Sequence, residues 1–221
     1  MQKARFDGVY ELPGKPKIFT KNMVEGVSVY GERLYKDGGI EYREWDPKRS
    51  KLGASILKGV SQTGLREDYT VLYLGSSTGT TVSHVSDIVG VKGFVFALDF
   101  APRVLRDLVF LCEQRKNVCP ILSDANQPSK YMHQVQLVDF LFQDIAQKNQ
   151  LEIFMKNLDL FLKDGAFGFL AIKARSVDVG KRPQVIYQEV RAELEKKVII
   201  VDFKVLDPYE KDHCCFVVKK K

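Results

Sequence analysis

The chain has 221 residues, of which 45% are hydrophobic and 28% charged, and this composition excludes a chain that stays disordered. No apolar run approaches the roughly 20 residues that span a bilayer, and the first residues lack a signal-peptide hydrophobic region. We therefore expect an intracellular protein without membrane contact. The net charge of +6 and the pI of about 9.0 favour a polyanionic partner such as nucleic acid.

Residues 1–46 differ in pattern from the rest of the chain. Glycine and proline separate short runs such as KIFTK (17–21) and VSVYGERLY (27–35), which is typical of a small antiparallel sheet. The tripeptide Asp37–Gly39 is a candidate hairpin turn. The sequence thus predicts a small N-terminal β-domain over 1–46 and a larger domain over 47–221.

From Thr70 onward, short apolar runs alternate with amphipathic ones, which predicts strands joined by crossover helices. The expected helices are 80–89, 102–115, 149–163 and 183–196, two of which open on proline, a helix-start signal. The expected strands are 70–75, 94–99, 118–124, 138–144, 166–174, 198–207 and 214–219. The connection before the last strand is too short for a crossover helix, so the last pair should be antiparallel. The fold class is α/β, with a mostly parallel seven-stranded sheet.

The loop YLGSSTGTT places Gly75 at the end of a strand and Gly79 before a helix, where a ligand could approach the backbone closely. Its spacing is neither the G-x-G-x-x-G dinucleotide fingerprint nor a phosphate-binding loop, because no lysine follows. By itself the loop fits equally well a tight turn that serves only packing.

An aspartate ends each of the next three strands: Asp99, Asp124 and Asp144. At the carboxyl edge of a sheet, Asp99 could accept hydrogen bonds from two ribose hydroxyls. Asp124 could bind an adenine amine or hold a loop, and Asp144 could face a cation. The alternative is that each aspartate caps the helix that follows. Together the three favour a nucleoside pocket.

At this point the sequence resembles the fibrillarin family, specifically its archaeal type of RNA-guided ribose 2′-O-methyltransferase. The resemblance covers essentially the whole chain. It rests on RSKLGASILKG (49–59), YLGSSTGTTVSH (73–84), FAPR (100–103), SDAN (123–126), QDIAQKNQ (143–150), AIKARSVD (171–178) and EKDH (210–213). The resemblance implies a Rossmann-like methyltransferase domain behind the small β-domain, with S-adenosyl-L-methionine (AdoMet) as methyl donor.

The resemblance also implies the residues that bind the cofactor. Combined with the glycine-rich loop, the expected cofactor site comprises Gly75, Gly79, Thr80, Thr81, Asp99, Phe100, Asp124, Ala125, Asp144, Ile145, Ala146 and Gln147. The family usually has glutamate where this chain has Asp99, so the ribose contact must span one more methylene. Lys148 stands where archaeal relatives usually have proline.

A Lys-Asp-Lys-His set forms the catalytic centre in the family, and it falls here on Lys51, Asp144, Lys173 and His213. Lys173 is our candidate for the group that activates the hydroxyl, because burial and the charge of Lys51 would favour its neutral form. Asp144 would oppose that, so Lys173 is either a base or an electrostatic anchor. His213, expected in the connection before a strand, either orders that loop or acts on the ribose. The scattered histidines predict no metal site.

The segment KARSVDVGKRP brings Arg175, Lys181 and Arg182 beside the expected site, where they could bind RNA phosphates. The resemblance implies a catalytic subunit of a box C/D ribonucleoprotein that methylates guide-selected nucleotides of rRNA and tRNA. Its implied partners are box C/D guide RNA, target RNA, a Nop-domain scaffold protein and a kink-turn-binding ribosomal-type protein.

Two other functions fit part of the sequence. A noncatalytic RNA-binding or scaffold subunit that kept the fold agrees with the basic charge and with the departure at Asp99. An NAD-binding oxidoreductase fits less well, because the spacing of the glycine-rich loop is wrong for it. Binding of AdoMet rather than NAD would distinguish these classes.

Overall fold

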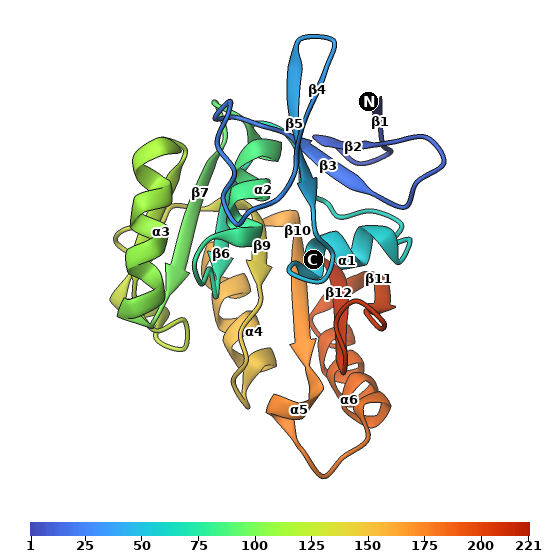
Figure 1. The fold of residues 1–221 in the computed structure, drawn as a ribbon. Coiled ribbons are helices and arrows are strands. Elements are labelled where there is room, and N and C mark those ends of the chain that lie inside the picture. Colours follow the sequence, from blue (N-terminus) through green and yellow to red (C-terminus); the bar gives the residue numbers. More distant parts are fainter.

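The computed structural model describes residues 1–221, and its N-terminal part is a five-stranded antiparallel sheet in the order β1-β2-β3-β5-β4. Its strands are β1 (Gln2–Lys3), β2 (Val9–Glu11), β3 (Ile18–Lys21), β4 (Leu34–Asp37) and β5 (Ile40–Trp45). The predicted turn joins β4 to β5: Asp37 pairs with Ile40, and Gly38 and Gly39 both have positive φ. This hairpin projects from the top of the molecule (Figure 1).

The second sheet has seven strands in the order β11-β12-β10-β9-β6-β7-β8. Its central strands pair in parallel, whereas β12 is antiparallel to both β10 and β11, which confirms the predicted antiparallel final pair. The strands are β6 (Thr70–Leu74), β7 (Phe94–Asp99), β8 (Val118–Leu122), β9 (Val138–Gln143), β10 (Leu162–Lys173), β11 (Val198–Val205) and β12 (His213–Lys220). Strand β10 begins four residues before the prediction, ahead of a register shift between Leu162 and Phe167.

The four predicted helices are present as α2 (Thr80–Val89), α3 (Pro102–Gln114), α4 (Gln150–Phe161) and α6 (Pro183–Glu195). Two short helices were not predicted, α1 (Lys51–Leu57) and α5 (Ala174–Val177), and a 3₁₀ turn covers Pro128–Lys130. Helix α1 contains Gly53, a poor helix former, but Ser50 caps its first turn and most of its residues are buried. A Cβ on Gly53 would lie 3.1 Å from Nε1 of Trp45, so glycine permits this close packing.

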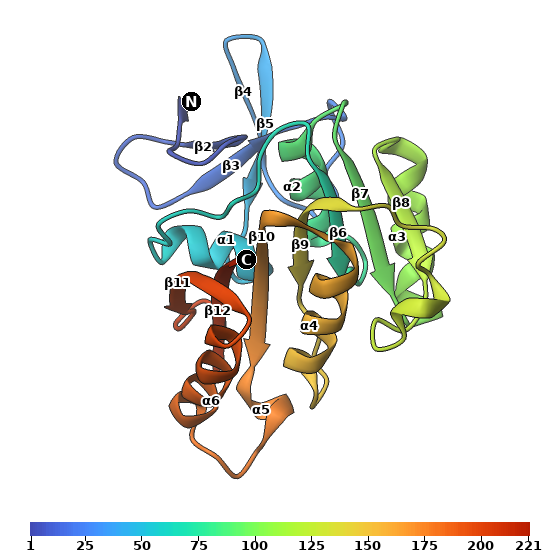
Figure 2. The same ribbon diagram turned by 180° about the vertical axis from the view of Figure 1, so that it is seen from behind.

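Helices cover both faces of the seven-stranded sheet (Figures 1 and 2). Alternate residues of each central strand point to opposite faces and form two hydrophobic cores. One core joins the sheet to α1, α2, α3 and the N-terminal sheet, and the other joins it to α4 and α6. This layered α/β arrangement leaves the carboxyl ends of the parallel strands open at the lower end of Figure 1, as the sequence predicts.

The N-terminal sheet shares its core with the larger sheet. Ile18 and Trp45 belong to the same buried cluster as Val71 of β6 and Val85 of α2. The division into 1–46 and 47–221 follows the two sheets but stays a prediction, because packing is continuous across it. No helix has the length and apolar character to cross a bilayer.

Candidate active site

A cavity of about 290 Å³ opens at the carboxyl ends of β6, β7 and β9. Its walls combine two carboxylates with apolar side chains and with backbone of the glycine-rich loop. The lining residues are Gly75, Ser77, Leu98, Asp99, Phe100, Ala125, Asp144, Ile145, Ala146 and Gln147. Most of the cofactor residues expected from the sequence therefore surround one cavity.

The glycine-rich loop is held against the neighbouring strands by its backbone. Gly75 has φ of +83°, and a Cβ there would lie 2.2 Å from the carbonyl oxygen of Asp144. The N–H groups of Gly75 and Ser76 both donate to the carbonyl of Leu98. Gly75 thus permits close backbone packing, as in the alternative of a tight turn that serves packing. The same packing places Asp144 beside the loop.

Asp99 is largely buried and its carboxylate joins two loops. Its Oδ2 accepts from the N–H of Ser77 at 2.8 Å, and its Oδ1 accepts from the N–H of Ala101, which precedes α3, at 3.0 Å. Each carboxylate oxygen has two acceptor sites, so one site on each oxygen remains. Asp99 therefore both orders the loops, as the capping alternative requires, and keeps acceptors for two ribose hydroxyls.

The structure does not bring Asp124, Gly79, Thr80 and Thr81 into this cavity. Asp124 accepts from the N–H of Asn126 and from the side-chain amide of Gln127, so it holds a loop. Thr80 lines a separate cavity of about 440 Å³ between α3 and the loop around Tyr30. The cofactor role of these four residues stays a prediction.

Lys51 is the first residue of α1 and lies between two carboxylates. Its Nζ is 3.2 Å from Oδ2 of Asp144 and 3.7 Å from Oε1 of Glu210. Burial lowers the pKa of Lys51, but the two carboxylates raise it more, so the pKa lies above the ordinary lysine value. Ser50 fixes the start of the helix, because its hydroxyl accepts from the N–H of Gly53 and from the hydroxyl of Thr81.

Glu210 was not singled out from the sequence, although it stands in the EKDH motif. Burial raises its pKa, and Lys51 opposes that rise without cancelling it. Only the turn after β11 brings Glu210 toward α1, about 160 residues away in the chain. A local sequence pattern could not show the pairing of Glu210 with Lys51. The one available signal that Glu210 lies at the site was its place in the same motif as His213.

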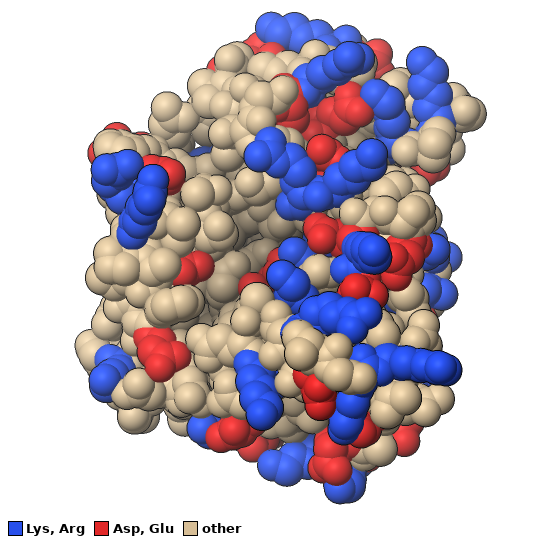
Figure 3. Space-filling model, turned by 60° about the horizontal axis from the view of Figure 1, so that its bottom comes forward, with Lys and Arg blue, Asp and Glu red and all other residues tan.

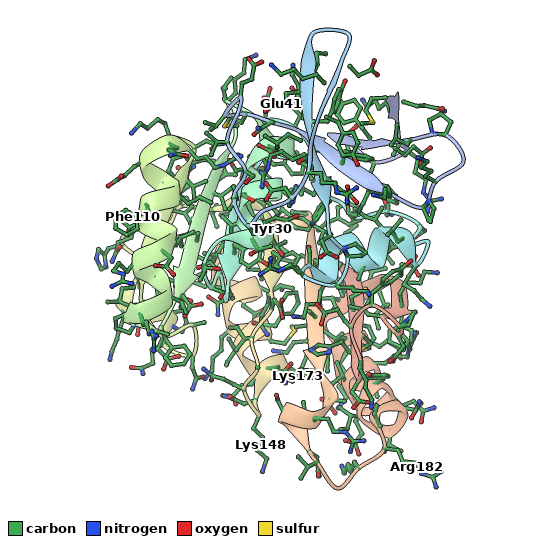
Figure 4. All side chains as sticks on the ribbon, viewed as in Figure 1. Tyr30, Glu41, Phe110, Lys148, Lys173 and Arg182 are labelled. Atoms are coloured by element: carbon green, nitrogen blue, oxygen red, sulfur yellow. The ribbon has the colours of Figure 1, made fainter.

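Lys173, the last residue of β10, is exposed and takes part in none of the ion pairs, although the neighbouring Arg175 pairs with Asp212. The expectation that Lys173 is buried is therefore wrong, and its catalytic role stays a prediction. β10 continues past the end of β9, so its last side chain leaves the core. Figure 4 shows Lys173 at the lower end of the sheet, near the end of the strand.

His213 is the first residue of β12 and is only 8% exposed, so the expectation that it lies in the preceding connection is wrong. It stands directly opposite Lys173 in the antiparallel register. Its Nδ1 is 2.7 Å from the carbonyl oxygen of Lys211, and because a carbonyl can only accept, Nδ1 carries a proton. In the neutral ring, Nε2 therefore holds the free lone pair.

The three predicted RNA-binding residues lie around α5 and the start of α6. Arg175 pairs with Asp212 at 3.2 Å and Lys181 with Glu189 at 2.6 Å, whereas Arg182 has no acidic partner. Figure 4 shows Arg182 and Lys148 extending from the same end of the molecule as Lys173. In Figure 3 lysine and arginine side chains gather along one side of a hollow in this surface. Their role in RNA binding stays a prediction.

Comparisons with known proteins agree with this geometry. The family model described as Fibrillarin matches residues 1–221. The chain is 50% identical to a fibrillarin-like rRNA/tRNA 2′-O-methyltransferase of Thermococcus onnurineus, over 100% of this chain and 99% of that protein.

Two solved structures are also similar over nearly their whole length. Aeropyrum pernix fibrillarin, solved with natively bound S-adenosyl-L-methionine, has a TM-score of 0.90 and 44% identity, covering 98% of this chain and 96% of that chain. A fibrillarin from a fibrillarin/Nop5p complex has a TM-score of 0.90 and 40% identity, covering 99% of this chain and 100% of that chain. The fold is thus that of AdoMet-dependent methyltransferases, and the chain belongs to the fibrillarin family.

Proposed function

We propose that this protein transfers a methyl group from AdoMet to ribose 2′-hydroxyls of rRNA and tRNA, as the catalytic subunit of a box C/D ribonucleoprotein. The observation that carries the proposal is that Asp144 both lines the nucleoside-sized cavity and forms an ion pair with Lys51. Relatives covering 97% or more of the chain carry the name of that activity.

The cavity fits AdoMet chemically. The remaining acceptor sites on Asp99 suit the two ribose hydroxyls, and Ala125 and Ile145 offer an apolar surface for adenine. In the glycine-rich loop itself, the hydroxyl of Ser76 is buried without a hydrogen-bond partner. The carboxylate of Asp144 lines the cavity and would face a sulfonium cation, with Lys51 fixing its position.

Bound AdoMet would supply a methyl group on a positively charged sulfur. The bond between the methyl carbon and this sulfur would break as the hydroxyl oxygen attacks that carbon in line. Lys173 acts as the electrostatic anchor, because the burial on which the base alternative depended is absent. Its ammonium stabilises the negative charge that develops on the attacking oxygen. Nε2 of His213 accepts the hydroxyl proton, because Nδ1 already donates to the carbonyl of Lys211.

Substrate selection lies outside this chain in the proposed assembly. Guide RNA pairs with the target, and a Nop-domain scaffold and a kink-turn-binding protein present the duplex to the exposed cations near Lys173. The fibrillarin/Nop5p complex supports the Nop-domain partner. The relatives come from archaea, which have no nucleus, and this supports a cytoplasmic location.

The test is methyl transfer in a reconstituted complex with labelled AdoMet, guide RNA and target RNA. We expect one label at the guided nucleotide and none in a matched target with 2′-deoxyribose at that position. Calorimetric titration should show binding of AdoMet and none of NAD. Absence of both AdoMet binding and label would leave the noncatalytic scaffold as the function.

A further inference from the structure

Gln150, the first residue of α4, is fully buried, and its side-chain amide binds the main chain of Lys173. The N–H of Lys173 donates to Oε1 of Gln150 at 3.0 Å, and Nε2 of Gln150 donates to the carbonyl of Lys173 at 3.2 Å. One side chain thus satisfies both main-chain polar groups of the residue that ends β10.

This amide makes the hydrogen bonds that a neighbouring strand would make if β9 extended as far as β10. The parallel pairing of β10 with β9 ends at Leu170, opposite Gln143, so β10 runs three residues further without a strand on that side. Gln143 ends β9, and its Nε2 donates to the carbonyl of Gln150 at 2.6 Å. The main chain of α4 is thereby tied to the end of β9, and the Gln150 amide continues the hydrogen-bonding edge up to Lys173.

The same bonds determine how Lys173 faces His213. Because both main-chain groups of Lys173 point toward Gln150, the Lys173–His213 pair exchanges no main-chain hydrogen bonds. The next bond in that ladder is from the N–H of Ala174 to the carbonyl of Asp212. In an antiparallel pair of this kind the Cα atoms approach to about 4.5 Å, so the two side chains are as close as opposite residues become.

We propose that Gln150 is a positioning residue for methyl transfer, which holds the end of β10 so that Lys173 and His213 act on the same ribose hydroxyl. The inference rests on the proposed function, because it takes these two residues as the groups that meet the substrate. Gln150 itself does not line the cavity, and its side chain is not exposed to solvent.

The first test compares Gln150→Met with Asn117→Leu in the reconstituted complex. Asn117 is a matched control, because its buried amide likewise both donates and accepts: it donates to the main-chain carbonyls of Ser86 and Gly90 and accepts from the hydroxyl of Ser86, away from the site. We expect Gln150→Met to lower kcat by about 10- to 100-fold with unchanged AdoMet affinity, because small displacements of reacting groups cost that much. Asn117→Leu should lose comparable stability and keep kcat within about twofold.

Hydrogen exchange gives a readout independent of activity. The Lys173 amide should exchange faster in Gln150→Met than in the wild type, and not in Asn117→Leu. Unchanged exchange of that amide, or full kcat in Gln150→Met, would overturn the inference.

The second test uses Gln150→Glu, whose neutral acid keeps one donor and one acceptor, whereas its carboxylate can only accept. Its kcat relative to wild type should rise as pH falls from about 8 to about 5.5, because protonation restores the donor to the Lys173 carbonyl. The same ratio for Gln150→Met should stay flat. A flat ratio for both variants contradicts the inference.

The two proposals fail differently. If the wild-type complex transfers no methyl group, the proposed function is wrong and the inference falls with it. If the wild type is active and Lys173→Ala is inactive while Gln150→Met keeps full kcat, only the inference is wrong.

Discussion

Two clusters in this molecule pair aspartate and glutamate with cationic side chains, and they differ in how deeply they are buried. At the joint between the two sheets, Asp87 of α2 accepts from Arg43 of β5 at 2.8 Å and from Arg115, after α3, at 2.5 Å. Glu32 pairs with Arg43 at 2.6 Å, and all four side chains are 2% exposed or less. At the candidate site, Lys51, Asp144 and Glu210 are partly exposed.

The difference lies in how many hydrogen-bonding positions are already used. The carboxylate of Asp87 also accepts from the hydroxyl of Thr20 and the N–H of Met23, so it has no capacity for a ligand. Asp144 has the single partner Lys51 and lines a cavity, and Lys173 has no acidic partner. Saturated charges hold the fold together, whereas unsaturated charges at a cavity remain available for substrate.

The largest effect should follow from Asp87→Asn, which leaves two buried guanidinium groups without their shared carboxylate. We expect a loss of about 3–5 kcal/mol in the free energy of unfolding, measured by denaturant titration. The control is Asp139→Asn, which breaks a partly exposed pair with Lys163 and should cost about 1 kcal/mol or less. Similar losses in the two variants would break the comparison between buried and exposed charge.

Lys173→Ala tests the candidate site, where charged groups keep unused hydrogen-bonding positions. Methyl transfer to a guided RNA target should fall by about 100-fold or more, because the charge that stabilises the developing oxyanion is lost. AdoMet affinity and the unfolding midpoint should not change, because Lys173 is exposed and outside the cavity wall. Lys163→Ala, at the opposite end of β10, is the control and should keep full activity. Retained activity in Lys173→Ala would remove this residue from the mechanism.

Glu210→Gln should have a smaller effect on the same site. Lys51 keeps Asp144 at 3.2 Å and loses only the partner at 3.7 Å, so the ion pair persists with less restraint. We expect kcat to fall by about two- to fivefold, because an ion pair between partly exposed side chains contributes about 1 kcal/mol or less. A loss as large as that of Lys173→Ala would mean that Glu210 has a direct chemical role.

The effect that is smallest at neutral pH is the one that His84 has on stability, because it develops only as the pH falls. Burial lowers the pKa of His84 well below its ordinary value, and Arg43 and Arg115 lower it further. Below about pH 6.5 the unfolded chain binds a proton that the folded protein excludes, so stability falls as pH decreases. Relative to His84→Gln, the wild type should lose up to about 1.4 kcal/mol per pH unit there. The exposed His133 is the control, and His133→Gln should behave as the wild type.

The sequence predicted the seven strands and four long helices because each had a strong local signal. Proline at the first position marks the starts of α3 and α6, and the apolar runs match the buried strands. Helix α1 was missed because its stability comes from the cap by Ser50 and from packing against Trp45. Tertiary contacts outweighed the low local propensity.

The candidate site was predictable where residues follow strand ends. Asp99 and Asp144 both line the cavity, because the carboxyl ends of parallel strands meet at one edge. Glu210 and Gln150 were missed, because their partners are distant in sequence or are main-chain atoms that no side-chain pattern reveals. The exposure of Lys173 depends on β10 being longer than β9, which apolar periodicity does not determine.

The saturated cluster at the joint also has a mechanical consequence. Arg43 and Glu32 belong to the N-terminal part of the chain, and Asp87 and Arg115 to the part that carries the cavity, so the two parts are fastened without a hinge. A partner that binds the projecting β4–β5 hairpin at the far end would therefore rotate the candidate site together with the hairpin (Figure 1). The orientation of the cavity therefore changes only when the two parts rotate together as one body.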